Sequence, residues 1–182
     1  VNGAFDGGRP NLSKVSLNAP QGRITAGDSR TSLITLNGSV VSNVGPMSIN
    51  GQAIKILADK NEAAVISDQN VGGWSTEPEE PLEIGSEGVT RSIQIEGEVQ
   101  ALRRSVELHA ADRISISADT DYAVEAMNHS ASIGSDDTQL VSLDQAIIAH
   151  GGAIDIRGKN ISLSTEKQLW AATAGGNTVT LG

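Results

Sequence analysis

Residues 152–164, GAIDIRGKNISLS, contain the clearest structural pattern in this sequence. Ile154 and Ile156 lie two positions apart, Ile161 and Leu163 repeat the arrangement, and polar residues with a glycine separate the two pairs. Apolar residues at every second position place their side chains on one face of a β-strand. Gly, Asn and Ser are typical of the corners between such strands. The stretch therefore predicts two short strands joined by a tight corner.

The same pattern recurs along most of the chain, with turn residues after each run. Successive runs begin roughly seven to ten residues apart, which is the rhythm of short strands separated by corners. An immunoglobulin-like sandwich has similar spacing, but it normally carries a packed aromatic core. The other apolar pairs include Val15/Leu17, Ile24/Ala26, Ile34/Leu36, Met47/Ile49, Ile54/Ile56, Ile93/Ile95, Ile114/Ile116, Leu169/Ala171 and Val179/Leu181.

The composition favours a narrow interior built from aliphatic residues. The 182 residues are 38% hydrophobic but only 2% aromatic, whereas compact cores usually use aromatic side chains to fill wide interiors. We therefore predict an all-β fold, an elongated β-helix or β-solenoid rod. The chain begins at Val1 without Met, and we expect it to be part of a longer protein.

Charge and cysteine content exclude several kinds of function. The formal net charge of −9 argues against sequence-independent binding of nucleic acid, which requires clustered Lys and Arg, and against docking on anionic lipid. The absence of Cys excludes disulfides and thiolate metal sites.

Three segments are predicted from shifts in composition. Residues 1–69 form an N-terminal rod segment, residues 70–91 an acidic loop or joint rich in Gly, Pro and Glu, and residues 92–182 a C-terminal rod segment. Within residues 98–111, an amphipathic helix competes with two strands centred on Val99/Ala101 and Val106/Leu108. We favour strands because the flanking runs alternate.

Three passages in the last third of the chain resemble a known family. They are RISISAD at 113–119, GAIDIRGKNISLS at 152–164 and ATAGGNTVTLG at 172–182. Residues 111–182 resemble the C-terminal β-helix of contractile-injection spikes, which are the VgrG proteins of type VI secretion and the cell-puncturing spikes of contractile bacteriophages. The preceding two thirds share only the general rhythm.

The resemblance implies a homotrimer, an interlocked trimeric β-prism in which three chains wind around one axis. It implies a structural spike or shaft segment that pierces a target envelope without catalysis, in a virion tail or baseplate or a secreted injection apparatus. Contact with the target membrane would be transient. A PAAR-type tip protein would cover the C-terminal base, which we assign to Val179, Leu181 and Gly182.

The sequence contains no convincing catalytic, cofactor or metal site. Asp119/Asp121 and Asp136/Asp137 offer oxygen ligands of the kind that Ca²⁺ prefers, but Asp is also a normal corner residue. His109, His129 and His150 lie far apart without ligand spacing, and no nucleophile-elbow pattern surrounds Ser130. We therefore predict no enzyme activity, no cofactor and no metal.

Two rival functions remain open. The first is a single-chain adhesin or glycan-binding module that uses the flank of the rod. The second is a polysaccharide-degrading enzyme, whose carboxylate pair would come from distant strands. The alternation also predicts side-chain directions: Trp170 outward, Ser115, Asp155 and Ser162 outward, and Ile114, Ile116, Ile154, Ile156, Ile161 and Leu163 inward.

Overall fold

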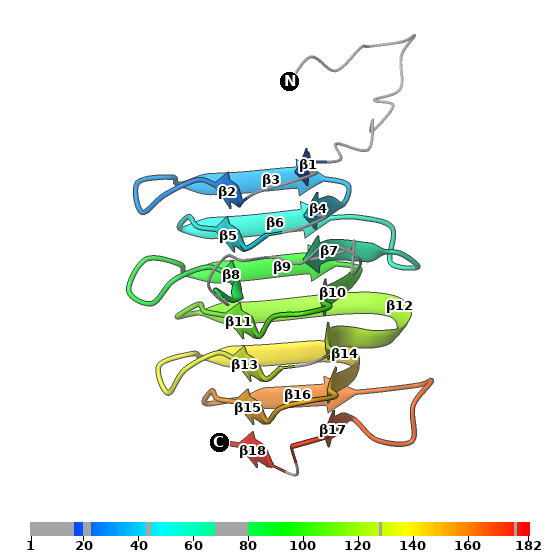
Figure 1. The fold of residues 1–182 in the computed structure, drawn as a ribbon. Coiled ribbons are helices and arrows are strands. Elements are labelled where there is room, and N and C mark those ends of the chain that lie inside the picture. Colours follow the sequence, from blue (N-terminus) through cyan, green and yellow to red (C-terminus); the bar gives the residue numbers. More distant parts are fainter. Residues whose placement is uncertain (1–16, 20–22, 43–44, 68–79, 128, 177) are drawn as a thin grey trace, which may run out of the picture.

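The chain forms a stack of strand coils that rises from one end of the molecule to the other (Figure 1). The structure is a computed structural model, and it describes residues 17–19, 23–42, 45–67, 80–127, 129–176 and 178–182. These residues form 18 strands and no helix. Every pairing among these strands is parallel.

The strands belong to two sheets, one of 11 strands and one of seven. The seven-stranded sheet consists of β2 (Ile24–Ala26), β5 (Met47–Ile49), β8 (Leu82–Ile84), β11 (Val106–Leu108), β13 (Ala131–Ile133), β15 (Ile154–Ile156) and β18 (Val179–Leu181). The larger sheet consists of β1 (Leu17–Ala19), β3 (Leu33–Asn37), β4 (Val40–Ser42), β6 (Ala53–Leu57), β7 (Ala63–Ser67), β9 (Ser92–Glu96), β10 (Glu98–Ala101), β12 (Arg113–Ala126), β14 (Leu140–Ala149), β16 (Ile161–Ser164) and β17 (Ala172–Ala174).

Two long strands connect the parts of the larger sheet. The first half of β12 pairs with β9, and its second half pairs with β10. In the same way, β14 pairs with β16 through its first half and with β17 through its second half. Each inner coil therefore has three sides. Two of them belong to the larger sheet and the third is a short strand of the smaller sheet, and together they surround one core.

Aliphatic ladders fill the core because successive coils keep the same register along each face. On one face the inward residues stack directly, as Ile54 on Ile93 and Ile93 on Ile114. All three are fully buried, and each such side chain contributes roughly 1.5–3 kcal/mol by leaving water. The complete ladder is Ile34, Ile54, Ile93, Ile114, Val141 and Ile161.

Longer and shorter corners alternate along one edge of the stack. The longer corners at 27–31, 85–90 and 134–138 share one hydrogen bond. In each corner the hydroxyl oxygen of a Thr accepts from the backbone N–H of the residue three or four positions before it. In the last of these corners, Thr138 also donates its hydroxyl to the carbonyl of Ala110, at 2.7 Å, in the shorter corner of the coil before. Gly134 begins this corner at φ 78°, a conformation that favours glycine.

The structure corrects the predicted fold class. A β-helix or β-solenoid rod wound as an interlocked trimeric β-prism would place strands of two other chains between the coils of one chain. Here each coil pairs directly with the next coil of the same chain, as Ile114 does with Ile93 on one side and Val141 on the other. The prediction was therefore wrong, because alternation shows which face of a strand points inward and does not show which strand lies beside it.

The predicted side-chain directions are largely confirmed. Ile114, Ile116, Ile154 and Ile156 are buried, and Ile161 and Leu163 are partly buried against the core. Residues 98–111 form strands β10 and β11, as favoured over a helix.

One predicted strand is wrong. Leu169 and Ala171 lie in the loop before β17, and Leu169 is 93% exposed. Trp170 is exposed, as predicted. Residues 70–79 of the predicted acidic joint, Trp74 among them, lie outside the described residues. Its larger part, residues 80–91, contains β8, which pairs with β5 and β11.

Candidate functional site

The last coil presents an open end of the stack, which we call the C-terminal face and define by β16, β17 and β18. Among the described strands, β16 and β17 pair only with β14, and β18 pairs only with β15. The other edge of each strand therefore has backbone N–H and C=O groups without a strand partner. Val179 and Leu181, two of the predicted partner-binding residues, are 43% and 55% exposed on this face, and Gly182 follows them.

No charged residue occupies the strands of the C-terminal face. Their sequences are ISLS, ATA and VTL. Natural sheets usually protect an edge with Lys, Pro or a bulge. Beside the face, the loop at 165–171 carries the exposed side chains of Leu169 and Trp170. The face can therefore bind another strand edge through backbone hydrogen bonds and aliphatic side chains.

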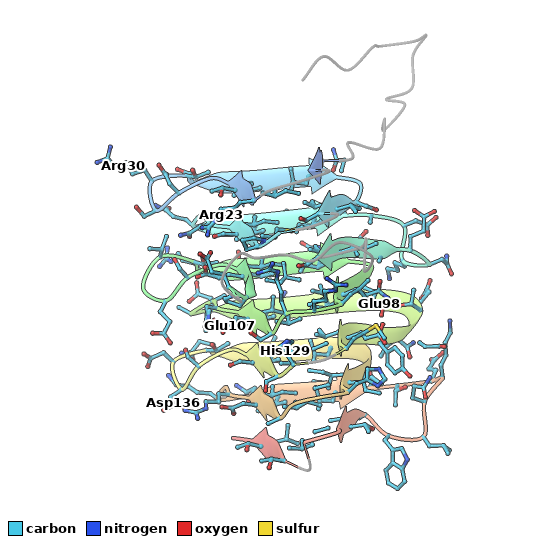
Figure 2. The ribbon with its side chains drawn as sticks, viewed as in Figure 1. Arg23, Arg30, Glu98, Glu107, His129 and Asp136 are labelled. Carbon is cyan, nitrogen blue, oxygen red and sulfur yellow. The ribbon has the colours of Figure 1, made fainter. Side chains whose placement is uncertain are left out.

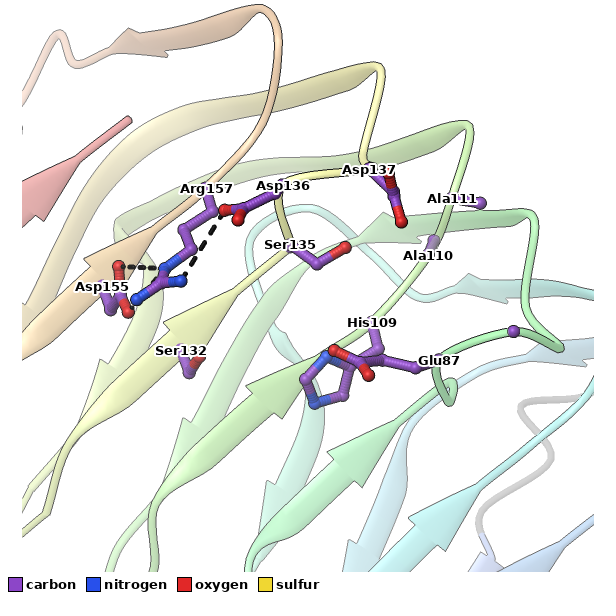
Figure 3. Close-up of a pocket in the computed structure, with 12 residues that line it drawn as sticks. Glu87, His109, Ala110, Ala111, Ser132, Ser135, Asp136, Asp137, Asp155 and Arg157 are labelled. Carbon is purple, nitrogen blue, oxygen red and sulfur yellow. Dashed lines mark hydrogen bonds and ion pairs between the residues drawn. The ribbon is translucent and has the colours of Figure 1, made fainter.

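A polar groove lies between two of the longer corners (Figure 3). Its volume is about 640 Å³, and the shorter corner at 109–111 lies between the walls formed by corners 85–90 and 134–138. Arg157 bridges two carboxylates there: its Nε lies 3.0 Å from Asp155 Oδ2 and its Nη1 lies 3.6 Å from Asp136 Oδ1. The hydrogen bond to Asp155 raises the pKa of the Arg157 guanidinium, and the charges of both carboxylates add to this effect.

His109 faces the same groove, opposite Glu87 (Figure 3). Its Nδ1 is buried without a hydrogen-bond partner, and its Nε2 lies 3.8 Å from Glu107 Oε2. Asp136 and Asp137, the sequence-based candidates for calcium ligands, line the groove. Within the described part of the chain, no three His, Cys, Asp or Glu side chains form a group that could hold a metal ion.

A second polar cluster crosses three strands on the side of the stack away from Asp136 (Figure 2). We call it the carboxylate row and define it as Glu98, Gln100, Glu125 and His150. The Gln100 amide nitrogen donates to Glu98 Oε1 at 3.2 Å and to Glu125 Oε2 at 3.1 Å. Glu125 Oε1 lies 3.1 Å from His150 Nε2. The row thus joins two carboxyl groups through one amide.

The two carboxyl groups of the row have different environments. Burial raises the pKa of Glu98 from 4.5 to about 7, the hydrogen bond from Gln100 lowers it in part, and the neighbouring charge of Glu125 raises it. Glu98 is only 5% exposed. Glycosidases also use a pair of carboxyl groups, but here both groups accept from the same amide.

The row is bordered by the corner at 119–122 and by the loop at 165–171. Asp121, Tyr122 and Lys167 line a shallow depression over the row. Lys167 Nζ donates to the carbonyl of Asp119. Burial raises the pKa of Tyr122, and the charges of Glu125, Asp121 and Glu98 raise it further. Asp119 and Asp121, the other candidate calcium ligands, thus lie at the corner beside the row.

The sequence interpretation missed both the groove and the row. Gln100 and Glu125 are 25 residues apart, and so are Glu125 and His150. Each step crosses one coil, but coil length varies along the chain, from 20 residues between Ile34 and Ile54 to 39 between Ile54 and Ile93. No fixed period therefore marked these polar residues as neighbours, and the short alternation is the same in every coil.

The C-terminal face, the groove and the row are the three candidate sites of the described structure. The residues that it describes contain no helix long and apolar enough to cross a membrane. Comparison of the chain with protein-family models, with curated proteins and with solved structures finds no match.

Proposed function

We propose that this chain is a noncatalytic structural module, a stiff stack of coils that docks a partner at its C-terminal face. The observation that carries the proposal is the group of exposed apolar side chains on and beside this face, with Leu169 93%, Trp170 70%, Leu181 55% and Val179 43% exposed. A partner of matching chemistry presents its own strand edge with aliphatic side chains directed at Val179 and Leu181.

The stack itself suits a mechanical role. Its parallel ladders connect each coil to the next by backbone hydrogen bonds, and buried aliphatic residues fill the inner coils. Bending such a body requires many hydrogen bonds and contacts to distort together. A stiff body of this kind transmits force along the stack.

The spike or shaft segment of a contractile injection machine is the specific form of this function that we predicted. Its proposed partner is a PAAR-type tip protein on the C-terminal face. Because the coils of one chain pair with one another, the structure is not the interlocked prism expected of a spike. The spike role therefore rests on the resemblance and on the C-terminal face. The homotrimer of this proposal associates through the outer surfaces of three stacks.

The groove favours a second candidate function. It is a polar cavity of about 640 Å³ on the flank of the stack, which is within the size range of ligand sites. A single-chain adhesin or glycan-binding module would use such a flank. Soaking crystals or titrating the protein with glycan fragments tests this candidate, and unchanged spectra of the groove residues would count against it.

The docking proposal is tested by placing charge on the C-terminal face. We expect the wild-type chain to bind an immobilised PAAR-type protein. V179K/L181K should bind at least about tenfold more weakly, because the partner would bury two ammonium groups that have no counter-charge in the complex. T180K is the matched control, since Thr180 pairs with the outward Asp155. No binding by the wild type, or equal loss in T180K, contradicts the docking proposal.

Light scattering tests the spike role separately. A trimer is the predicted outcome, whereas a monomer of 18.8 kDa would remove the spike role and leave the single-chain scaffold.

A further inference from the structure

The corners between the two sides of the larger sheet alternate in length. The last residues before these corners stack in register, and they are Asn37, Leu57, Glu96, Ser117, Asp144 and Ser164. The first residues after them stack as well, and they are Val40, Val65, Val99, Val124, Ile147 and Ala172. Short corners therefore alternate with loops along this edge; the short corners are 38–39, 97–98 and 145–146, and the loops are 58–64, 118–123 and 165–171.

The three short corners begin with the same unusual backbone conformation. Gly38 and Gly97 have φ angles of 128° and 112°, and Gln145, at the equivalent place two coils further on, has a φ of 117°. Glycine adopts such angles freely, whereas a residue with a Cβ is strained there. Among the described residues, Gln145 is the one non-glycine residue with a positive φ. A strained residue where the equivalent corners have glycine indicates that its side chain has a task.

The side chain of Gln145 holds the start of the loop at 165–171. It is only 5% exposed, and its Oε1 accepts from the Thr165 hydroxyl and from the Glu166 N–H, each at 3.4 Å. The Thr165 hydroxyl oxygen accepts in turn from the Gln168 N–H at 3.1 Å. One buried amide oxygen therefore fixes the first turn of the loop to the stack.

The same loop exposes its largest apolar side chains beside the C-terminal face (Figure 1). Lys167 anchors it a second time by donating to the Asp119 carbonyl, and the exposed Leu169 and Trp170 follow shortly after. A free loop would gain by folding these side chains onto the stack, because that removes apolar area from water. Anchoring the loop opposes this collapse. An aromatic side chain that is held in place loses little freedom when a partner binds it.

We propose that Gln145 positions the loop at 165–171 as a preformed docking loop, whose Leu169 and Trp170 enter an apolar pocket of the partner at the C-terminal face. This inference rests on the proposed function and adds the residue that prepares the contact. The rim of the partner's pocket is basic, because Asp119, Asp121 and Glu166 are exposed at or beside the loop.

Amide exchange in the isolated chain tests the positioning role. Q145M has a side chain of similar length without the acceptor oxygen. We expect it to raise the exchange rates of the Glu166 and Gln168 amides at least about tenfold. Q145E keeps an acceptor oxygen in either protonation state and should restore slow exchange. Unchanged exchange in Q145M, or equally fast exchange in Q145M and Q145E, would overturn the proposal.

Two further variants keep this test decisive. S117A removes the bond from the Ser117 hydroxyl to Asp144, next to Gln145, and should leave both amides protected. T165V removes the same hydrogen bonds from the loop side and should release the Gln168 amide, even if a substitution of the buried Gln145 does not fold. Loss of protection in S117A, or full protection in T165V, contradicts the positioning role.

The pair Q145A and Q145G tests the backbone strain. Both variants lose the amide group, and only Q145A keeps a Cβ at a φ of 117°. At an ordinary backbone conformation, Ala gives the more stable chain. Here we expect Q145G to unfold at the higher urea concentration. A higher unfolding midpoint for Q145A would show that the conformation is not strained and would contradict the proposal.

Binding to an immobilised PAAR-type protein tests the use of the loop in docking. L169S/W170S should keep the wild-type unfolding midpoint, because both side chains are exposed, and should bind at least about tenfold more weakly. Q145M should bind about threefold more weakly because the loop is no longer preformed, and rising salt should weaken wild-type binding. Wild-type binding together with equal binding by L169S/W170S overturns the docking loop and leaves the proposed function standing. No binding by the wild type contradicts the proposed function itself.

Discussion

Strands β15 and β18 are neighbours in the same sheet and have the same pattern, yet their environments differ. Ile154 pairs with Val179, and Ile156 pairs with Leu181. The two Ile side chains are fully buried, whereas Val179 and Leu181 are 43% and 55% exposed. An apolar-x-apolar sequence therefore sets the direction of a side chain, and a coil on both sides is needed to bury it.

The larger sheet repeats the contrast. Val141 and Leu143 of β14 are buried, and their register partners Ile161 and Leu163 of β16 are only partly buried. The free energy that an aliphatic residue contributes follows the area it removes from water. Equivalent substitutions should therefore be much more damaging in the inner coils than in the last one.

The largest expected effect comes from placing Asp at matched positions of the two strands. I156D buries an unpaired carboxyl group and should cost several kcal/mol, about enough to unfold a marginally stable chain. L181D leaves its charge near water and should cost about 1 kcal/mol. Urea unfolding measures both. Equal costs would mean that the C-terminal face is covered in solution.

The next effect separates a buried carboxyl group from an exposed one. Glu98 has a pKa of about 7 in the folded chain against 4.5 in the unfolded chain, so the stability it contributes is fully present below pH 4.5 and is lost as the pH rises through 7. At pH 8, E98Q should be more stable than the wild type by on the order of 3 kcal/mol, and the gain should shrink towards pH 5. E166Q should show no such pH dependence. A constant E98Q effect at all pH values would contradict the assignment.

A smaller effect compares two glycines in left-handed conformations. A Cβ at Gly134, φ 78°, would clash with the backbone carbonyl of Arg157 in the next coil, whereas a Cβ at Gly88, φ 71°, would meet no atom within 4 Å. G88A should cost about 1 kcal/mol from the backbone conformation alone. G134A should cost about 2–3 kcal/mol because the corner must also shift. Thermal unfolding distinguishes them, and similar melting temperatures would argue against close stacking of these corners.

The smallest effect compares an inner threonine with one on the last coil. Thr138 is fully buried, accepts from the Ser135 N–H at 2.9 Å and donates to the Ala110 carbonyl at 2.7 Å. T138V should cost about 1–2 kcal/mol because buried backbone groups lose their partner. T180V, on exposed β18, should stay within about 0.5 kcal/mol of the wild type. A neutral T138V would show that the longer corners do not depend on their shared threonine.

The partner-binding base stays a prediction. The resemblance to contractile-injection spikes assigns it to Val179, Leu181 and Gly182, and in the structure Val179 and Leu181 belong to β18. The carboxylate row could not be found in this way, because Glu98, Glu125 and His150 meet only when successive coils lie on one another. Coil length varies along the chain, so no regular spacing marks these residues as neighbours.

Alternation by itself determined most of the strand segments, Leu169/Ala171 excepted, and which of their side chains point inward, as Ile114 and Ile156 do. Only the tertiary structure decided that the coils of one chain pair directly with one another, that Val179 stays exposed where Ile154 is buried, and that burial raises the pKa of Glu98 to about 7. Strand direction is a local property of consecutive residues. Pairing, burial and protonation depend on neighbours that lie a full coil away along the chain.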